Sequence, residues 1–520
     1  MSLARAIATV GGYTMISRVT GFVRDVLIAA IVGAGPVADA FFVAFQIPNF
    51  FRRLTGEGAL TVAFVPLFAG TLESDGRKAA LAFAGQVQAV LLTVLLAFLL
   101  VAEIAMPWVM LVLAPGFADE PERFDLAVEL TRITFPYLPL ISMVALWGGI
   151  LNSLEKFWAM AAAPILLNLI LIITLVTAVD RLETPGHALA WGVAAAGLAQ
   201  ALFLALACRR SGAFPPLRWP RLTPQVKRLL TLMAPAALGA GVVQVNQFIG
   251  ILLASLLPAG AISYLYFADR VVQLPLGVVG VAIGTVVLPL LSRQVRGGRE
   301  AEARDTQNRA LEMALLLTVP AAAALAVIAE PVTAVLFERG RFTAEASAAT
   351  AAAMAAFAAG LPAFVLIKVF QPGFFARQDT ATPVKVAVAA VIANLAFNLA
   401  LLPLFAHVGI ALSTTLAAWL NAGTLAWLLH KRGHFDPDDR LIRRAPRIVL
   451  AAGGMALAVW AVSRVFESWL QADSVAGIIG LVGLVVLGLM VYGTACVVLG
   501  AARPAELRAA FRRGGTREIP

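Results

Sequence analysis

Basic side chains inside apolar segments are the residues of this sequence whose type and position could do chemistry. An arginine near the bilayer centre costs about 2.5–3.5 kcal/mol on insertion scales, so it is expected to have a partner or a function. Guanidinium groups bind phosphate oxygens in a bidentate manner, so several around one chamber would form an anion site. Six basic residues lie within long apolar segments: Arg18, Arg24, Arg52, Arg53, Arg270 and Lys368.

Arg18 and Arg24 lie six residues apart in one apolar segment. On a helix this spacing offsets the two side chains by roughly 120°, so both could border one cavity without stacking. Arg18 could equally extend to the lipid headgroups, because long basic side chains snorkel. Asp25 follows Arg24 directly and could neutralise part of its charge, which would make the two a structural pair.

A second charged segment follows in the next apolar stretch. Proline and glycine residues flank Arg52 and Arg53, which indicates a broken helix of the kind tolerated only beside a cavity or other protein. Arg52 is the better candidate for the cavity, whereas Arg53 and Glu57 could form a structural pair. Asp39 lies at the preceding turn and could be either a cavity residue or a helix N-cap.

The second half of the chain carries a comparable segment. Asp269 and Arg270 lie within an apolar stretch, close to Ser263 and Gln273. We expect Arg24, Arg52 and Arg270 to converge on one polar chamber between two halves of the protein. Lys368 could be a further cavity residue, or it could extend to the membrane surface.

The elements that position these residues are predicted to be membrane-spanning helices. The sequence is 60% hydrophobic and 13% charged, against about 25% charged in soluble domains. A span needs about 20 mostly apolar residues, and such stretches recur along the whole chain. The apolar stretches predict about fourteen spans near 6–33, 37–69, 83–113, 124–152, 157–179, 186–208, 229–257, 260–291, 309–337, 346–375, 383–406, 408–430, 446–465 and 475–502.

The distribution of charge supports this topology. With the N-terminus inside, 28 of the 40 Lys and Arg residues fall in cytoplasmic segments and only six fall outside. An acidic group between Asp119 and Glu129 also falls outside. Because positive residues resist translocation, both termini are predicted to be cytoplasmic. The net charge of +10 lies in short loops between spans, so it does not indicate nucleic-acid binding.

A weak internal repeat predicts the domain organisation. Residues 149–155 and 373–379 are similar and lie 224 residues apart, and 40–45 and 264–269 share this offset. Two parallel six-helix halves related by a pseudo-symmetry axis are therefore expected. The predicted parts are 1–215, 216–432 and 433–520, the last with two more helices and a basic cytoplasmic tail.

Other kinds of chemistry find little support. The four histidines are scattered, and His430 and His434 have no acidic or Cys partner at metal-ligand spacing, so no metal site is expected. No nucleophile–base pair, paired acidic dyad or nucleotide-binding loop is present. We therefore expect no catalytic residue, no nucleotide and no other cofactor.

Several motifs, in order along most of the chain, resemble the MurJ (MviN) family of lipid II flippases. The specific N-terminal ones include the run Ser17–Asp25 and the run Asp39–Arg53. Shorter matches are Glu57–Ala59, Ala63–Pro66, Ala114–Phe117, Phe135–Tyr137, Tyr266–Arg270 and Thr382–Lys385.

This resemblance implies the fold of the multidrug/oligosaccharidyl-lipid/polysaccharide exporter superfamily, with two six-helix lobes plus two C-terminal helices. A groove beside the extra helices would take the polyprenyl tail, and the cationic cavity would take the diphosphate. The implied activity is movement of lipid II from the inner to the outer leaflet by alternating access. The family's cavity residues fall on Arg18, Arg24, Asp39, Asn49, Arg52, Ser263 and Arg270, with Asp25, Arg53, Gln273 and Lys368 as further candidates.

Two departures from the family pattern bear on the mechanism. Gln273 stands where relatives often have Glu, which makes the cavity more positive. The spans that bind sodium in some members carry amides here, such as Gln244 and Asn394, and no carboxylate. Dependence on the membrane potential is therefore a simpler expectation than sodium coupling.

The resemblance also implies the protein's setting. Lipid II and the bilayer are the expected partners, in the bacterial inner membrane, within peptidoglycan biosynthesis, cell wall biogenesis and the control of cell shape. A monomeric transporter that works with the cell-wall synthesis machinery is expected. The alternatives are another polysaccharide-lipid or multidrug exporter of the superfamily, or a membrane glycosyltransferase acting on the same lipid.

Overall fold

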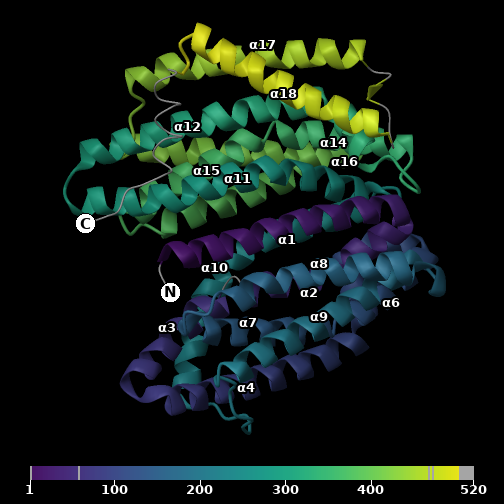
Figure 1. The fold of residues 1–520 in the computed structure, drawn as a ribbon, viewed down its shortest axis with the longest axis vertical. Coiled ribbons are helices and arrows are strands. Elements are labelled where there is room, and N and C mark those ends of the chain that lie inside the picture. The colour runs from purple at the N-terminus through teal and green to yellow at the C-terminus, as the bar shows by residue number, and fades with distance from the viewer. Residues whose placement is uncertain (1–2, 57–58, 467–468, 471–473, 503–520) are drawn as a thin grey trace. The chain divides into compact units, whose positions relative to one another are not determined.

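The computed structural model describes residues 3–56, 59–466, 469–470 and 474–502, and these form helices and turns without β-strands (Figure 1). Nine helical stretches of this described part are long and apolar enough to cross a membrane. The prediction of an all-α polytopic membrane protein is therefore confirmed. The count of about fourteen spans stays a prediction.

The chain divides into two compact units. Unit 1 is Met1–Ser263 with Gly340–Phe342, and unit 2 is Tyr264–Arg339 with Thr343–Pro520. The division near residue 263 falls within the first turn of one helix, α11 (Ala261–Arg296). The three parts expected from the repeat, 1–215, 216–432 and 433–520, stay a prediction.

Unit 1 is built from apolar helices that pack in neighbouring pairs. Helix α1 packs on α8, α8 and α7 pack on α9, and α2 packs on α6. Its core is rich in aromatic rings, such as those of Phe64 and Phe83, whose centroids lie 5.7 Å apart. The helices are α1 (Leu3–Val32), α2 (Pro36–Gly56), α3 (Ala59–Ser74), α4 (Gly76–Ile104), α5 (Met106–Leu113), η1 (Pro115–Asp119), α6 (Pro121–Thr134), α7 (Tyr137–Ser153), α8 (Trp158–Thr177), η2 (Val179–Arg181), α9 (Pro185–Arg210) and α10 (Pro224–Ser255).

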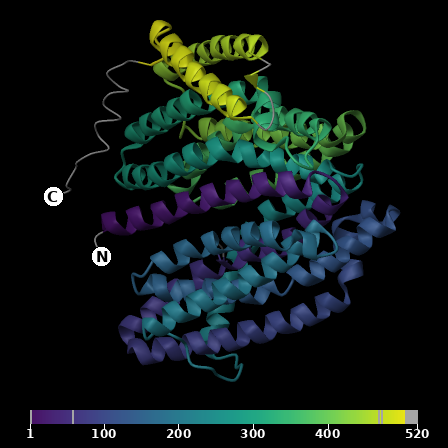
Figure 2. The same cartoon turned by 45° about the vertical axis from the view of Figure 1, so that its right-hand side comes forward.

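Unit 2 contains the rest of α11 and the C-terminal helices. Helices α11, α12, α15 and α16 share an apolar core that includes Leu291, Leu311, Val369 and Leu425. Helix α17 packs on α12 and on α18, and α17 and α18 lie side by side in both views (Figures 1 and 2). The helices are α12 (Glu300–Val327), α13 (Ala329–Phe337), α14 (Ala344–Ala358), α15 (Leu361–Phe375), α16 (Ala381–Lys431), α17 (Asp439–Val465) and α18 (Val475–Val498).

Prolines and one non-helical residue make the helices differ from the predicted spans. The span predicted at 124–152 occurs as α6 and α7, which part around Pro136, and the span at 346–375 parts at Gly360, shortly before Pro362. A proline has no backbone N–H to donate, and its ring clashes with the preceding turn of a helix, which explains breaks of this kind. The two spans predicted at 383–430 instead form α16, with a kink at Ala406, where φ is 46° and ψ is −128°.

Helix α1 ends in a turn that only glycine can make. Gly33 has a φ of +81°, and a Cβ there would lie 2.6 Å from the carbonyl oxygen of Arg341. The backbone N–H of Arg341 donates to the carbonyl oxygen of Ala30 at 2.8 Å. The segment Gly340–Phe342 therefore packs directly on the end of α1, within unit 1.

Candidate functional site

Arg24 lies in a buried polar network between α1 and α8. Its guanidinium donates to Asp25 Oδ1 at 3.0 Å from Nε and at 2.6 Å from a terminal nitrogen. The other terminal nitrogen donates to Asn168 Oδ1 at 2.8 Å. Asn168 in turn donates to the carbonyl oxygen of Ser17 at 2.9 Å. Arg24 and Asp25 therefore form the pair that the sequence suggested, with Asn168 as a further partner.

Asp39 is fully buried and holds three elements of unit 1 together. Its Oδ2 accepts from Arg123 on α6 and from the N–H of Gly260, both at 2.7 Å. Its Oδ1 accepts from the N–H and the hydroxyl of Ser263, at 2.8 and 2.5 Å. The carboxylate thus satisfies donors at the N-terminus of α11, where a negative charge is favourable.

The N-cap alternative for Asp39 is wrong in its original form. Helix α2 begins at Pro36, and the N–H of Asp39 already donates to the carbonyl oxygen of Gly35 at 2.9 Å. Asp39 is therefore inside its own helix and caps a different helix. The sequence could not show this, because the capped residues lie more than 200 positions away.

Near the end of α2, Arg53 is bound to α10. One of its terminal nitrogens donates to Gln247 Oε1 at 3.0 Å, so Arg53 has a structural partner in unit 1. The partner suggested from the sequence, Glu57, lies outside the described residues. Arg52 is in helical backbone, but its side chain also lies outside the described part. Helix α2 continues through Pro48 and ends at Gly56.

The other candidates of unit 1 differ in exposure. Arg18 is exposed on α1, Asn49 is half-buried on α2, and Ser263 is fully buried against Asp39. Three of the predicted arginines of this unit have described side chains, and Arg18 is the most exposed of them, since Arg24 is buried and Arg53 is half-buried.

Arg270 lies in unit 2 with an aromatic neighbour. Its Cζ lies 4.6 Å from the centroid of the Tyr266 ring, one turn earlier on α11. Stacking of this kind fixes the plane of a guanidinium. Gln273 donates to Asp269 Oδ2 on the same helix. The predicted convergence of Arg24, Arg52 and Arg270 involves both units and stays a prediction.

Lys368 packs against a glycine of unit 2. A Cβ at Gly280 would lie 3.0 Å from Lys368 Nζ, so the lysine occupies the space that a side chain at position 280 would need. This contact gives the small residue at 280 a packing role between α11 and α15. Lys368 is half-buried in this position.

An apolar groove lies on unit 2, between α12 and α17. Its volume is about 840 Å³. The lining is Val327 from α12 and Val449, Leu450, Gly453, Gly454, Ala456, Leu457 and Trp460 from α17. Such a surface suits a hydrocarbon chain, because it offers apolar contact and almost no hydrogen-bonding group.

Three important partners were not predicted from the sequence. Arg123 had been assigned to a charged loop, but it is 3% exposed and pairs with Asp39. Asn168 and Gln247 are amides that bind Arg24 and Arg53. A polar residue within an apolar span was the available signal for both amides, since such residues are rare and usually have partners.

Solved structures with this arrangement are membrane transporters. An inward-facing multidrug resistance MATE family transporter of the MOP superfamily has a TM-score of 0.65 and 13% sequence identity, over 82% of this chain and 98% of its own. The lipid II flippase MurJ in an inward closed conformation has a TM-score of 0.79 and 24% identity, over 94% of this chain and 98% of its own. The chain therefore shares the fold of these two membrane proteins.

Sequence relatives define the family more narrowly. The lipid II flippase MurJ family matches residues 28–480. A probable lipid II flippase MurJ of Rhizobium meliloti (strain 1021) is 45% identical over 99% of this chain and 97% of its own length. The lipid II flippase MurJ of Burkholderia cenocepacia is 38% identical over 87% of this chain and 88% of its own. The chain belongs to the lipid II flippase MurJ family, so it is a membrane transporter.

Proposed function

We propose that this chain moves lipid II from the inner to the outer leaflet of a bacterial inner membrane, by alternating access, for peptidoglycan synthesis. The observation that carries the proposal is the match to named lipid II flippases along nearly the whole chain, at up to 45% identity. The arginines within apolar helices supply the chemistry that a diphosphate-linked lipid needs.

The head group is proposed to bind arginines from both halves of the chain. Arg52 and Arg270 are the leading candidates, with Arg24 as a third. Arg270 is supported by its stacking on Tyr266, which orients the guanidinium. Arg24 would have to exchange its contacts with Asp25 and Asn168 for phosphate oxygens as the conformation changes.

The apolar groove between α12 and α17 is the proposed position of the polyprenyl tail. Its lining is apolar, and the glycines at 453 and 454 leave open space in it. A tail held there would remain in hydrocarbon surroundings while the polar head group crosses inside the protein. The hydrophobic effect opposes removal of the tail from such surroundings.

Several further parts of the proposal follow from the sequence. Both termini are placed in the cytoplasm because of the charge bias. The membrane potential is the proposed driving force, since the amides at Gln244 and Asn394 replace the carboxylates that sodium would need. The transporter is proposed to act as a monomer and to deliver lipid II to cell-wall synthesis enzymes.

Export of cationic drugs is a weaker proposal for this chain. A cation site needs a carboxylate that is not already neutralised. Asp25 lies 2.6 Å from a nitrogen of Arg24, and Asp39 lies 2.7 Å from a nitrogen of Arg123. Each of these two buried carboxylates is therefore matched by an arginine.

The test compares Ala and Lys substitutions of Arg24, Arg52 and Arg270. Lipid II binding and growth after depletion of the native flippase are measured, normalised to protein level in the membrane. Charge-assisted contacts contribute about 1.5–3 kcal/mol each, so loss of one should weaken binding about 10- to 150-fold. Lys should restore only part of this, because an ammonium group cannot make the bidentate contact.

Arg181→Ala is the matched control, since Arg181 is an exposed arginine in η2. It should bind lipid II like the parent. Parent-like binding by all three Ala variants would exclude the arginine site. Reduced protein level without reduced binding would instead make Arg24 a structural residue of the α1–α8 contact.

A further inference from the structure

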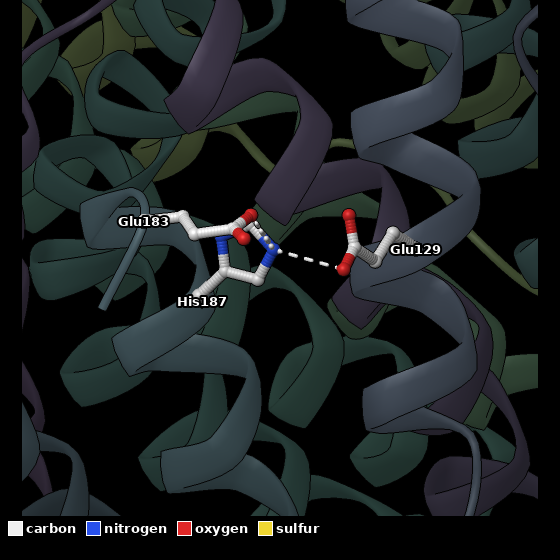
Figure 3. A group of neighbouring side chains, drawn as sticks. All are labelled: Glu129, Glu183 and His187. Atoms are coloured by element: carbon white, nitrogen blue, oxygen red, sulfur yellow. Dashed lines mark ion pairs between the residues drawn. The ribbon is translucent and has the colours of Figure 1, made fainter.

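Helices α6 and α9 of unit 1 bring three potential metal ligands together. Nε2 of His187 lies 3.4 Å from Oε1 of Glu129 and 3.9 Å from Oε2 of Glu183. One ligand atom from each residue lies within 4.8 Å of the others (Figure 3). Glu129 is on α6, Glu183 is in the turn before α9, and His187 is in the first turn of α9. The carboxylates approach the ring from two sides in Figure 3.

His187 is the residue that distinguishes this cluster from an ordinary acidic surface. It is 5% exposed, and its Nε2 has no hydrogen-bond partner among the described residues. The two glutamate side chains are 57% and 83% exposed. A buried ring nitrogen therefore faces outward toward two carboxylates that solvent can reach.

The other ring nitrogen of His187 contacts a threonine hydroxyl. Nδ1 lies 2.9 Å from the hydroxyl oxygen of Thr184, which also caps α9 by accepting the N–H of His187. With Nδ1–H donating to Thr184, the Nε2 lone pair points at the two carboxylates. The Nε2 lone pair and the two carboxylate oxygens would then repel one another, and a cation coordinated by all three would remove this repulsion.

The spacing and the ligand types favour a zinc-like ion. Zinc binds imidazole nitrogen at 2.0–2.1 Å and carboxylate oxygen at 2.0–2.2 Å with tetrahedral geometry, so its ligand atoms lie roughly 3.4 Å apart. The separations of 3.4 and 3.9 Å from Nε2 are close to this value. Calcium and magnesium prefer oxygen ligands alone, which the histidine does not match.

The backbone around His187 is held firmly. A Cβ at Gly186 would lie 2.9 Å from Leu130 and 3.0 Å from Val37, so the start of α9 packs tightly on α2 and α6. The histidine is therefore held in place before an ion binds, whereas the two exposed carboxylates can move to complete the coordination. We propose that Glu129, Glu183 and His187 bind one divalent transition-metal ion, with Zn²⁺ the best fit and water at the fourth position.

The proposed ion fastens α6 to the N-terminus of α9. The sequence places all three residues at the outer side of the membrane, where the acidic group around Asp119 is also predicted. Glu129 and His187 are 58 positions apart, so no motif marked them, and the prediction of no metal site rested on the scatter of the four histidines along the sequence. This site is independent of the proposed transport function.

The test uses full-length protein purified without a histidine tag, stripped of metal and dialysed against Zn²⁺. The parent should bind one Zn²⁺ per chain in the micromolar range, with excess Mg²⁺ unable to displace it. Glu129→Gln and Glu183→Gln should each weaken binding by at least about tenfold, the loss seen even for supporting residues at metal sites. Both residues are exposed, so these variants should fold like the parent.

His187→Ala should abolish binding, and Glu122→Gln serves as the control, because Glu122 is an exposed carboxylate in the first turn of α6. Zn²⁺ should raise the unfolding temperature of the parent and of the control, but not of the three ligand variants. Absence of stoichiometric binding, or parent-like binding by both Gln variants, would overturn the proposal.

Discussion

The position of Asp39 predicts that its substitution disrupts the fold of unit 1 before it affects any ligand. Asp39→Asn keeps the size of the side chain but leaves Arg123 without its buried counter-charge. Asp39 is 0% exposed and Arg123 is 3% exposed, so water cannot replace the lost partner. Removing one member of a buried ion pair costs about 3–5 kcal/mol.

This loss should be visible as a change in unfolding temperature. At about 2–4 °C per kcal/mol for a unit of roughly this size, Asp39→Asn should lower the unfolding temperature by about 6–20 °C. The measurement is the fraction of purified protein that still elutes as a folded species after heating in detergent. Membrane protein level gives a second readout, since it should fall in parallel.

A double-variant cycle isolates the ion pair. Asp39→Asn combined with Arg123→Met removes both charges, so its cost should be smaller than the sum of the single costs by about 1 kcal/mol or more. Glu120→Gln is the matched control: Glu120 lies 3.4 Å from the same arginine but is 50% exposed, and its loss should change stability by less than about 0.5 kcal/mol. Additive costs, or an Asp39→Asn variant that unfolds like the parent but binds lipid II poorly, would refute the structural reading.

Four further predictions concern other parts of the chain. Glu312 accepts hydrogen bonds from Arg309, Arg440 and Arg444, and Arg444 is buried. Glu312→Gln should therefore lower the free energy of unfolding by about 1.5–3 kcal/mol, measured by thermal unfolding. An unchanged unfolding temperature would contradict this. Hydrogen bonds from the Thr382 hydroxyl and N–H and the nearby Arg432 guanidinium lower the pKa of Asp379 from 3.8 to about 2. The stabilisation from Asp379 should therefore be complete above about pH 4 and be lost as the pH falls toward about 2, so the difference in unfolding temperature between the parent and Asp379→Asn should shrink over that window. Gly453→Trp should fill the apolar groove without a clash and reduce transport at normal protein level. The control is Gly423→Trp, at an equally open glycine of α16 outside the groove, which should not reduce transport. Equal activity of the two variants would show that the groove has no part in transport. A reporter fused after Arg513 should read cytoplasmic and one inserted near Asp119 should read periplasmic, and the same reading for both would exclude the predicted topology.

The helices could be predicted from the sequence because each depends mainly on local apolar composition. The predicted spans at 157–179 and 186–208 differ from α8 and α9 by at most two residues at each end. Breaks within spans, such as the one around Pro136, follow from the missing N–H of proline, which the hydropathy pattern does not register.

The candidate site was predictable only as a set of unusual residues. A charge inside an apolar helix must have a partner, so Arg24 and Asp39 could be identified as important. Their partners could not be, because Asn168 is 144 positions from Arg24, and Ser263 is 224 positions from Asp39. Proximity across such separations depends on packing, which no local pattern encodes.

The contact between Gly33 and the segment Gly340–Phe342 has a consequence for synthesis. Unit 1 is otherwise complete at Ser263, yet it includes three residues that are translated 77 to 79 positions later. At about 5–20 residues per second, unit 1 waits roughly 4–16 s after Ser263 for the segment that packs on the end of α1. During that interval the Ala30 carbonyl has no Arg341 N–H to accept from, so the ribosome and the insertion machinery hold an unfinished first lobe while much of the second is already being made.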